Sequence, residues 1–195
     1  RNERCNMKRY IVNFAVLLCV SASLVISASA YVKLGFTVGS KVTYYPYEGF
    51  ASLSRTHMSN AATVWNDAAG STLLAVSTTT QPNRSGYYKD DGKNYIYAED
   101  VGAGYVAQNH YWYSYSKLTQ SDINFNMYYS WANSAVNNAY DVYSVCLHEF
   151  GHTMGLGDVK TDGYKSRSIM YYTVYTNSTR RTLLSEDLAG IRALY

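Results

Sequence analysis

The chain has 195 residues, enough for one domain that buries a sizeable core. Its 17 basic and 14 acidic side chains give a formal net charge of +3 at pH 7. Four of the basic and one of the acidic side chains lie in the first thirty residues, so 13 of each sign remain beyond them and cancel. This balance provides no basic surface for nucleic acid, which we exclude as a partner.

The first thirty residues have the pattern of a secretory signal peptide. A short basic start at 7–9 precedes an almost continuously apolar stretch at 11–26, and small residues follow up to Ala30, where we expect cleavage. The alternative is an uncleaved signal anchor, although the apolar stretch is short for a membrane span. Residues 1–6 precede Met7, the expected initiator, and have no assigned role.

The remaining chain, residues 31–195, is predicted to form one exported domain. It contains a single cysteine, Cys146, and therefore no intramolecular disulfide. This pattern is more typical of a bacterial exported protein than of an animal one. We expect an extracellular monomer without stable membrane association after signal cleavage.

The first half of this domain is predicted to form two strands around one helix. Residues 41–47 alternate like a strand, and residues 71–79 are β-branched and apolar. Between them, residues 52–68 are expected to form a helix that Ser52 or Ser54 caps and Gly70 ends. Its predicted apolar stripe consists of Leu53, His57, Ala61, Val64, Trp65 and Ala68.

The second half is predicted to continue the sheet and to add two helices. A polar loop at 81–93 separates the two halves. Further strands are expected at 94–98, at 105–115 on the sheet edge, and at 122–128. Helices are expected at 139–154 and at 185–195, the last capped by Ser185 and suited to the helix dipole by Glu186 and Asp187.

The stretch HEFGHTMGLGD, residues 148–158, has the spacing of a zinc site. His148 and His152 are four apart, so a helix places both imidazoles on one face. Glu149 is rotated by about 100° from His148, which suits a general base for a metal-activated water better than a ligand. Gly155 permits a sharp turn that returns Asp158 to the ion as third ligand. The alternative is an ordinary helix with two exposed histidines and a solvated aspartate.

Together with Ser168-Ile-Met-Tyr-Tyr172, this motif resembles a metzincin zinc peptidase, whose pattern is HExxHxxGxxH followed by a Met-turn. Asp158 replaces the third histidine, a variant that snapalysin-type proteases share. Most of residues 31–195 is similar to a matrixin catalytic domain. The resemblance implies an α+β metzincin-like zincin fold. Its features are a twisted, mostly parallel five-stranded sheet with an antiparallel edge strand, two long helices and a C-terminal helix.

The same resemblance implies roles for residues outside the motif. Met170 would form the hydrophobic floor below the zinc ligands. Tyr172 would bind the metal or stabilise the transition-state oxyanion, or else be one more core or rim tyrosine. Residues 104–110 would supply the edge strand that pairs with an extended peptide substrate, and residues 172–183 would shape the S1′ pocket.

A calcium site is a further possibility from residue chemistry. Calcium prefers oxygen ligands, and four acidic side chains lie near the polar loop. These are Asp90, Asp91, Glu99 and Asp100. A solvated loop is an equal alternative.

The sequence thus predicts a secreted zinc-dependent endopeptidase with a protein or peptide substrate. His148, His152 and Asp158 would hold the zinc, and Glu149 would be the general base. The alternative is a catalytically inactive secreted protein that binds zinc or serves in adhesion, since the chain contains 22 tyrosines.

Overall fold

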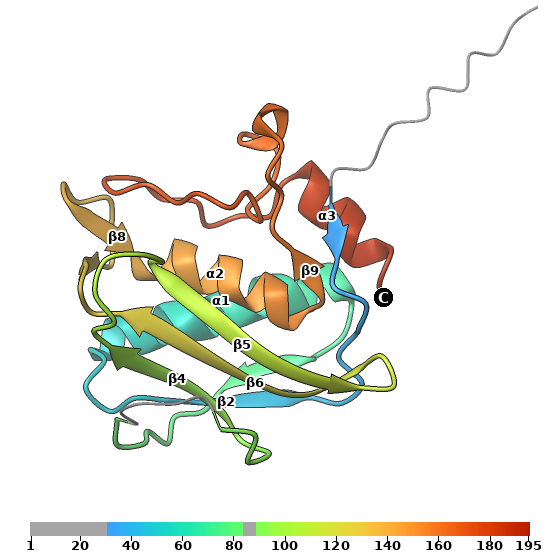
Figure 1. The fold of residues 1–195 in the computed structure, drawn as a ribbon, viewed down its shortest axis with the longest axis horizontal. Helices are drawn as coiled ribbons and strands as arrows, with labels where there is room; N and C mark the ends of the chain where they lie inside the picture. Colours follow the sequence, from blue (N-terminus) through green and yellow to red (C-terminus); the bar gives the residue numbers. More distant parts are fainter. Residues whose placement is uncertain (1–30, 84–88) are drawn as a thin grey trace, which may run out of the picture.

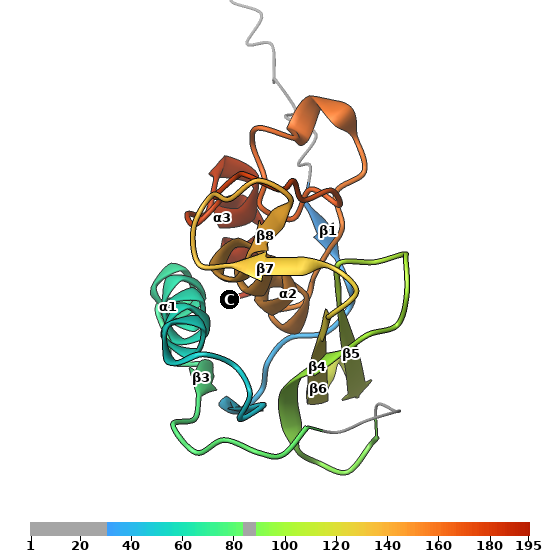
Figure 2. The same cartoon turned by 90° about the vertical axis from the view of Figure 1, so that its left-hand side faces the viewer.

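The computed structural model describes residues 31–83 and 89–195, so the predicted signal peptide lies outside the described residues. Helices α1 and α2 lie on one face of a twisted sheet, and α3 lies beyond α2 (Figures 1 and 2). In chain order the elements are β1 Val32–Lys33, β2 Val42–Pro46, α1 Ser52–Ala69, β3 Leu74–Val76, β4 Asn94–Glu99, β5 Ala107–Ser114, β6 Lys117–Asn126, β7 Ser130–Ala132, β8 Ala139–Asp141, α2 Val142–Thr153, β9 Leu156–Gly157, the 3-10 turn η1 Asp162–Tyr164 and α3 Ser185–Arg192.

The main sheet has the strand order β3-β2-β4-β6-β5. Its first four strands are parallel, and β5 pairs antiparallel with β6 at the edge. The central strands are buried on both faces because helices cover one side and loops the other, as is usual for parallel strands. The expected mostly parallel five-stranded sheet with an antiparallel edge strand is confirmed.

Helix α1 begins at the predicted residue and ends at Gly70, which has a left-handed φ of 65°. Its predicted stripe and cap were partly wrong. Leu53 is 54% exposed, and the buried face instead follows Met58 and Trp65 together with Ser54, Ala61 and Ala62. The large side chains Met58 and Trp65 lie seven positions apart, so they fix the face that turns inward. The N-cap is Ala51, without a side-chain hydrogen bond.

Helix α2 crosses the centre of the molecule and is buried on nearly all sides. It begins three residues later than predicted, because residues 139–141 form β8, which pairs with β7 beside the start of the helix (Figure 2). The Asp141 carboxylate caps the helix by accepting from Ser144 N at 3.0 Å. The indole of Trp65 donates to Leu147 O at 2.7 Å, which joins α1 to α2. Cys146 is buried in the core, as expected.

Other boundaries differ from the prediction because pairing partners decide them. Strand β3 is shorter than residues 71–79, since only three of its residues pair with β2. Strand β6 starts five residues earlier than predicted because it forms a hairpin with β5. The turn of this hairpin holds Tyr115 and Ser116 at positive φ, as a two-residue hairpin turn requires. In the described part of the chain, no helix is both long and apolar enough to cross a membrane.

Candidate metal centre

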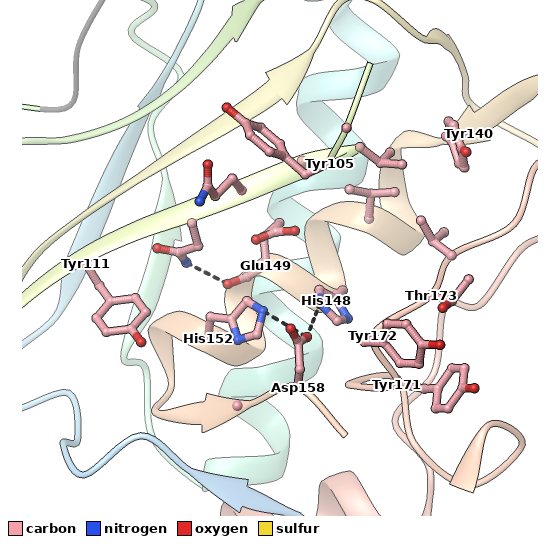
Figure 3. Close-up of a pocket in the computed structure, with 18 of the residues that line it drawn as sticks. Tyr105, Tyr111, Tyr140, His148, Glu149, His152, Asp158, Tyr171, Tyr172 and Thr173 are labelled. Carbon is pink, nitrogen blue, oxygen red and sulfur yellow. Dashed lines mark hydrogen bonds and ion pairs between the residues drawn. The ribbon is translucent and has the colours of Figure 1, made fainter. Parts of the chain in front are cut away.

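His148 and His152 lie one turn apart on the face of α2 that opens to the cleft (Figure 3). Their ring centroids are 4.8 Å apart. The Nδ1 atom of His148 lies 2.9 Å from Ile169 O, and that of His152 lies 2.8 Å from Leu156 O. A carbonyl can only accept a hydrogen bond, so each Nδ1 carries the proton. In the neutral imidazoles each Nε2 therefore has the lone pair that would bind a metal ion, which is the usual arrangement for ligating histidines.

The chain turns sharply after α2 and returns to the histidines. Gly155 has a φ of +92°, and a Cβ atom there would lie 2.3 Å from the carbonyl oxygen of Phe36. Only glycine fits both the conformation and the space. The two residues of β9 then pair with β1 and lead directly into Asp158.

The returned Asp158 completes a group of three ligand atoms. Its Oδ1 lies 3.2 Å from His148 Nε2 and 3.5 Å from His152 Nε2. Two ligands of a tetrahedral zinc ion, each at about 2.0–2.1 Å from the metal, are themselves about 3.3 Å apart. Asp158 Oδ1 is buried, and apart from these two histidine contacts it has no hydrogen-bond partner among the described residues. The donor set therefore fits a zinc ion, to which all three atoms could bind.

The charges of His148, His152 and Asp158 also suit the binding of a cation. Burial lowers the pKa of His148, but the carboxylates of Asp158 and Glu149 outweigh burial and raise it to about 9. Burial, together with the charge on His148, lowers the pKa of His152 to about 4. Without a metal ion, one proton thus balances the Asp158 carboxylate. A cation can replace that proton, so metal binding would release it.

Glu149 lies beside the ligand group and points to the cleft (Figure 3). Its side chain is 5% exposed, and its Oε2 has no hydrogen-bond partner among the described residues. Burial raises the pKa of Glu149 to about 7, although the charge on His148 opposes this rise. Its backbone carbonyl accepts from Asn109 Nδ2 at 2.7 Å. A buried carboxylate with one free oxygen beside a metal site can accept a proton from a water molecule.

Met170 lies against the turn of α2 between the two histidines and is 2% exposed. It packs against Gly151, where a Cβ atom would lie 2.2 Å from the Met170 sulfur. Asp187 of α3 fixes the turn that carries Met170, because its carboxylate accepts from Ser168 Oγ at 2.6 Å and from Ile169 N at 2.8 Å. The sequence indicated only a helix-dipole role for Asp187. Its contact with the turn was missed because it joins residues 18 positions apart.

Comparison with known proteins identifies the family of the chain. The family model of matrixins, peptidase family M10, matches residues 31–195. The chain belongs to the matrixin family. The expected family and the α+β fold, with a mixed five-stranded sheet and three helices, are thereby confirmed. The family implies zinc, and the His148–His152–Asp158 group is the candidate for it.

Three relatives share short stretches with this matrixin. Metalloendoproteinase 1 of Glycine max is 39% identical over 62 residues, and Metalloendoproteinase 2-MMP of Arabidopsis thaliana is 39% identical over 61 residues. Neutrophil collagenase of Homo sapiens is 31% identical over 75 residues. The stretches cover 32%, 31% and 38% of this chain but 19%, 15% and 15% of the relatives, less than a fifth of their length. None of the three is bacterial, so they do not support the expected bacterial origin.

The cleft of this matrixin has a volume of about 610 Å³ and runs past Glu149 between two walls. One wall is the start of the edge strand, residues 104–109, and the other includes residues 171–174. Tyr172 lines the cleft on the side of His148 and is 53% exposed, whereas Tyr111 lies on the side of His152 (Figure 3). The predicted edge strand and the residues after Met170 thus face one another across the cleft.

The four acidic candidates for calcium do not form a metal-binding group. Within residues 31–83 and 89–195, the one group of three or more His, Cys, Asp or Glu side chains close enough for an ion is His148, His152 and Asp158. Asp91 Oδ1 accepts from Lys93 N, and Asp100 Oδ1 accepts from Gly102 N, as in ordinary turns. Glu99 ends strand β4, and Asp90 is exposed. The alternative of a solvated loop fits these contacts.

A buried polar network that the sequence did not indicate joins the sheet to α2. Asn109 donates to Thr153 Oγ1 at 2.8 Å and accepts from Ser121 Oγ at 2.7 Å. The hydroxyl of Tyr44 donates to Ser121 Oγ at 2.6 Å and lies 2.7 Å from Thr153 Oγ1. With the bond from Asn109 to the Glu149 carbonyl, this network fixes the edge strand relative to the helix that carries the site.

Proposed function

We propose that this matrixin is a secreted zinc-dependent endopeptidase, with zinc held by His148, His152 and Asp158. When bound, the zinc would act as a Lewis acid that makes a water molecule acidic and polarises the scissile carbonyl. Glu149 then accepts a proton from the attacking water and passes it to the nitrogen of the leaving amine. Met170 holds the ligand-bearing turn of α2 from below.

The observation that carries this proposal is the free Oε2 of Glu149 beside a group of three ligands. A structural zinc site is closed by four protein ligands, whereas a catalytic site keeps one position open. Here three candidate ligands are present, and the buried carboxylate of Glu149 lines the same cleft without a role in holding the ion. A site that only binds metal or serves adhesion has no use for it.

Strand β5 supports a polypeptide substrate. Among the described strands only β6 pairs with β5, which leaves the second edge of β5 available to an extended chain. Such a chain could add to the sheet by backbone hydrogen bonds along residues 104–109, and its scissile bond would then cross Glu149. The side chain after the scissile bond would enter between the start of α2 and residues 172–183. Tyr172 is placed at the rim, where it could contact a substrate.

Secretion, extracellular location and a monomeric state belong to the same proposal. They rest on the predicted signal peptide at residues 1–30 and on a domain at residues 31–195 that lacks disulfides. Calcium is not part of the proposal, because the four acidic candidates do not gather into a group of three or more close carboxylates among the described residues.

The test uses the purified protein without its predicted signal peptide. Cleavage of casein and of quenched peptides is followed with and without a chelator, for the wild type and for Glu149→Gln, and the metal content of both is measured. We expect about one zinc per chain in both proteins and cleavage only by the metal-loaded wild type. Zinc without cleavage of a broad peptide library would favour the inactive binding protein. Absence of zinc would refute the metal site.

A further inference from the structure

The two sides of the cleft near His148 come from distant parts of the chain. Strand β8 contributes Tyr140 and the start of α2 contributes Val145, and the segment after Met170 contributes Tyr172 and Val174. We call residues 172–183 the wall segment. It contains no helix or strand before α3 begins. Its position must therefore be set by individual contacts rather than by a regular hydrogen-bond ladder.

The wall segment is attached at both of its ends and near its middle. At its start, Tyr172 N donates to Val159 O at 3.2 Å. Near its middle, Asn177 N donates to Val136 O at 3.0 Å. Towards its end, the contact is a buried ion pair between Arg181 and Asp141. The first two contacts involve one backbone amide each, and Asn177 N is shared with Ala139 O at 3.3 Å. The charge-assisted ion pair is stronger than either of them.

This ion pair has the geometry of a fixed two-pronged contact. Arg181 Nε donates to Asp141 Oδ2 at 3.0 Å, and Nη2 donates to Oδ1 at 2.5 Å. Nη2 also donates to Asn133 O at 2.8 Å. The Asp141 side chain is fully buried, and the Arg181 side chain is 30% exposed. A planar guanidinium bound at two points restrains the orientation of the wall segment as well as its distance.

Asp141 also belongs to the opposite side of the cleft. The same carboxylate caps α2 through Ser144 N at 3.0 Å and Ser144 Oγ at 2.6 Å, and Ser144 Oγ in turn accepts from Arg180 N at 2.7 Å. One carboxylate thus holds both the first turn of α2 and the end of the wall segment. Tyr140, its chain neighbour, lines the cleft.

We propose that Arg181 is a positioning residue for substrate selectivity, which it controls by holding the wall segment against the first turn of α2. This inference rests on the proposed function of the cleft as a peptide-binding site. With the ion pair intact, the space between the two walls has a fixed width and admits a limited range of side chains. Without it, the segment between Asn177 and α3 loses its two-pronged attachment and is held by the contacts of Arg180 instead, so it can shift outward and larger side chains enter.

Arg180 and Arg181 are adjacent but contact different parts of the molecule, so Arg181 can be replaced without removing the contacts of Arg180. Arg180 Nη2 donates to Ser168 O at 3.2 Å and to Lys165 O, next to the turn that carries Met170. Arg181 has no such contact and reaches only the start of α2 and the residues before it. Its replacement therefore removes no contact of the turn that carries Met170.

The experiment measures kcat and KM of the full protein on quenched peptides that differ only in the residue after the scissile bond. Arg181→Met is expected to lower the ratio of kcat/KM between the best and the worst peptide about tenfold. The change should lie in KM, while kcat on the best peptide stays within about threefold. Arg181→Lys keeps the charge but not the planar, two-pronged guanidinium. Its ratio of kcat/KM should therefore lie between those of the wild type and Arg181→Met. Arg167→Met removes the arginine–carboxylate pair with Glu186, outside the wall segment, and should leave the ratio unchanged.

A second variant separates positioning from stability. Arg181→Met leaves Asp141 buried without its cation, which destabilises the fold. Asp141→Asn combined with Arg181→Met removes that charge and retains an oxygen for the helix cap. This double variant should regain stability but keep the broadened selectivity. If stability and selectivity return together, Arg181 has only a structural role and the inference fails.

Hydrogen exchange gives a readout that does not depend on cleavage. In Arg181→Met the amides of Asn177 and Arg180 should exchange about tenfold faster, while those of Ile169 and Met170 keep their rates. Unchanged exchange at Asn177 and Arg180 would refute the attachment. An active wild type whose variant shows faster exchange but unchanged selectivity would refute the inference alone. A wild type that cleaves no peptide would instead refute the proposed function.

Discussion

The metal site and the substrate cleft lie side by side but are built in opposite ways. The three ligands and Glu149 come from eleven consecutive residues, 148–158, and backbone carbonyls orient both histidines. The cleft walls come from segments up to 70 residues apart in the chain and are joined by half-buried polar side chains such as Asn109 and Arg181. Chemistry is thus encoded locally, whereas substrate recognition depends on long-range contacts.

This difference predicts that changes within the motif abolish catalysis. Changes in the contacts that join the cleft walls, which we call the frame, should only reduce catalytic efficiency. The largest effect is expected for Glu149→Gln, which keeps the shape of the side chain but removes its ability to accept a proton. We expect kcat to fall about 10³-fold or more while zinc stays bound, since Glu149 is not a ligand. Single-turnover kinetics and metal analysis would test this. A variant that loses zinc together with activity would make Glu149 part of the metal site and break the comparison.

The second prediction concerns the close packing below the motif. Gly151→Ala places a methyl group 2.2 Å from the Met170 sulfur and 2.9 Å from the Trp65 ring, in a buried site. We expect the free energy of unfolding to fall by about 1–3 kcal/mol, because the core must shift to make room.

A double-mutant cycle with Met170→Ala supplies the control for this prediction. Met170→Ala alone should cost about 2–5 kcal/mol through the cavity that it leaves. In that background Gly151→Ala should cost much less, because the added methyl group then occupies free space. Additive costs in urea unfolding would show that the two positions do not conflict.

Sequence reasoning succeeded where the signal is local. The spacing from His148 to Asp158 predicted which residues meet, and Gly155 has the left-handed φ that this return requires. The alternation of strands also predicted most of the sheet. It failed at boundaries that depend on partners, such as β8 before α2 and the shift of the buried face of α1 to Met58. It also missed Asn109, Asp187 and Arg181, since polar residues that meet across 18 to 44 positions leave no periodic pattern.

The third prediction tests the frame itself. Asn109→Ala removes the amide that donates to Glu149 O and Thr153 Oγ1, and it leaves Ser121 Oγ without its acceptor. Unsatisfied buried groups cost about 1–3 kcal/mol, so stability should fall by this amount. Because the edge strand also loosens from α2, kcat/KM for peptides should fall about tenfold, mostly through KM.

Asn83→Ala is the matched control for the frame. The Asn83 amide also braces a strand, through Ala98 O at 2.6 Å, but on β4, outside the cleft. It should lower stability without changing KM. Equal effects of the two variants on KM would mean that the edge strand has no special link to the site.

The smallest expected effect is the pH dependence of the stability that Asp141 contributes. Burial alone would raise the pKa of Asp141, but hydrogen bonds from Arg181 and Ser144 hold it below its ordinary value. A carboxyl whose pKa is lower in the folded state stabilises the fold above its unfolded pKa of about 3.9, and this stabilisation is lost as the pH falls through the folded pKa. Each unit of lowering corresponds to about 1.4 kcal/mol.

Urea unfolding of the chelator-treated protein between about pH 6 and pH 3 would measure this contribution. Asp141→Asn cannot titrate at this position, so it should be less stable than the wild type at the upper pH and approach it at the lower pH. Asp67→Asn, which changes an exposed acid on α1, should run parallel to the wild type throughout. If Asp141→Asn also runs parallel, the charge of Asp141 contributes nothing to stability. The two sides of the cleft would then be joined by hydrogen-bond geometry alone, and Arg181 would act through its shape rather than its charge.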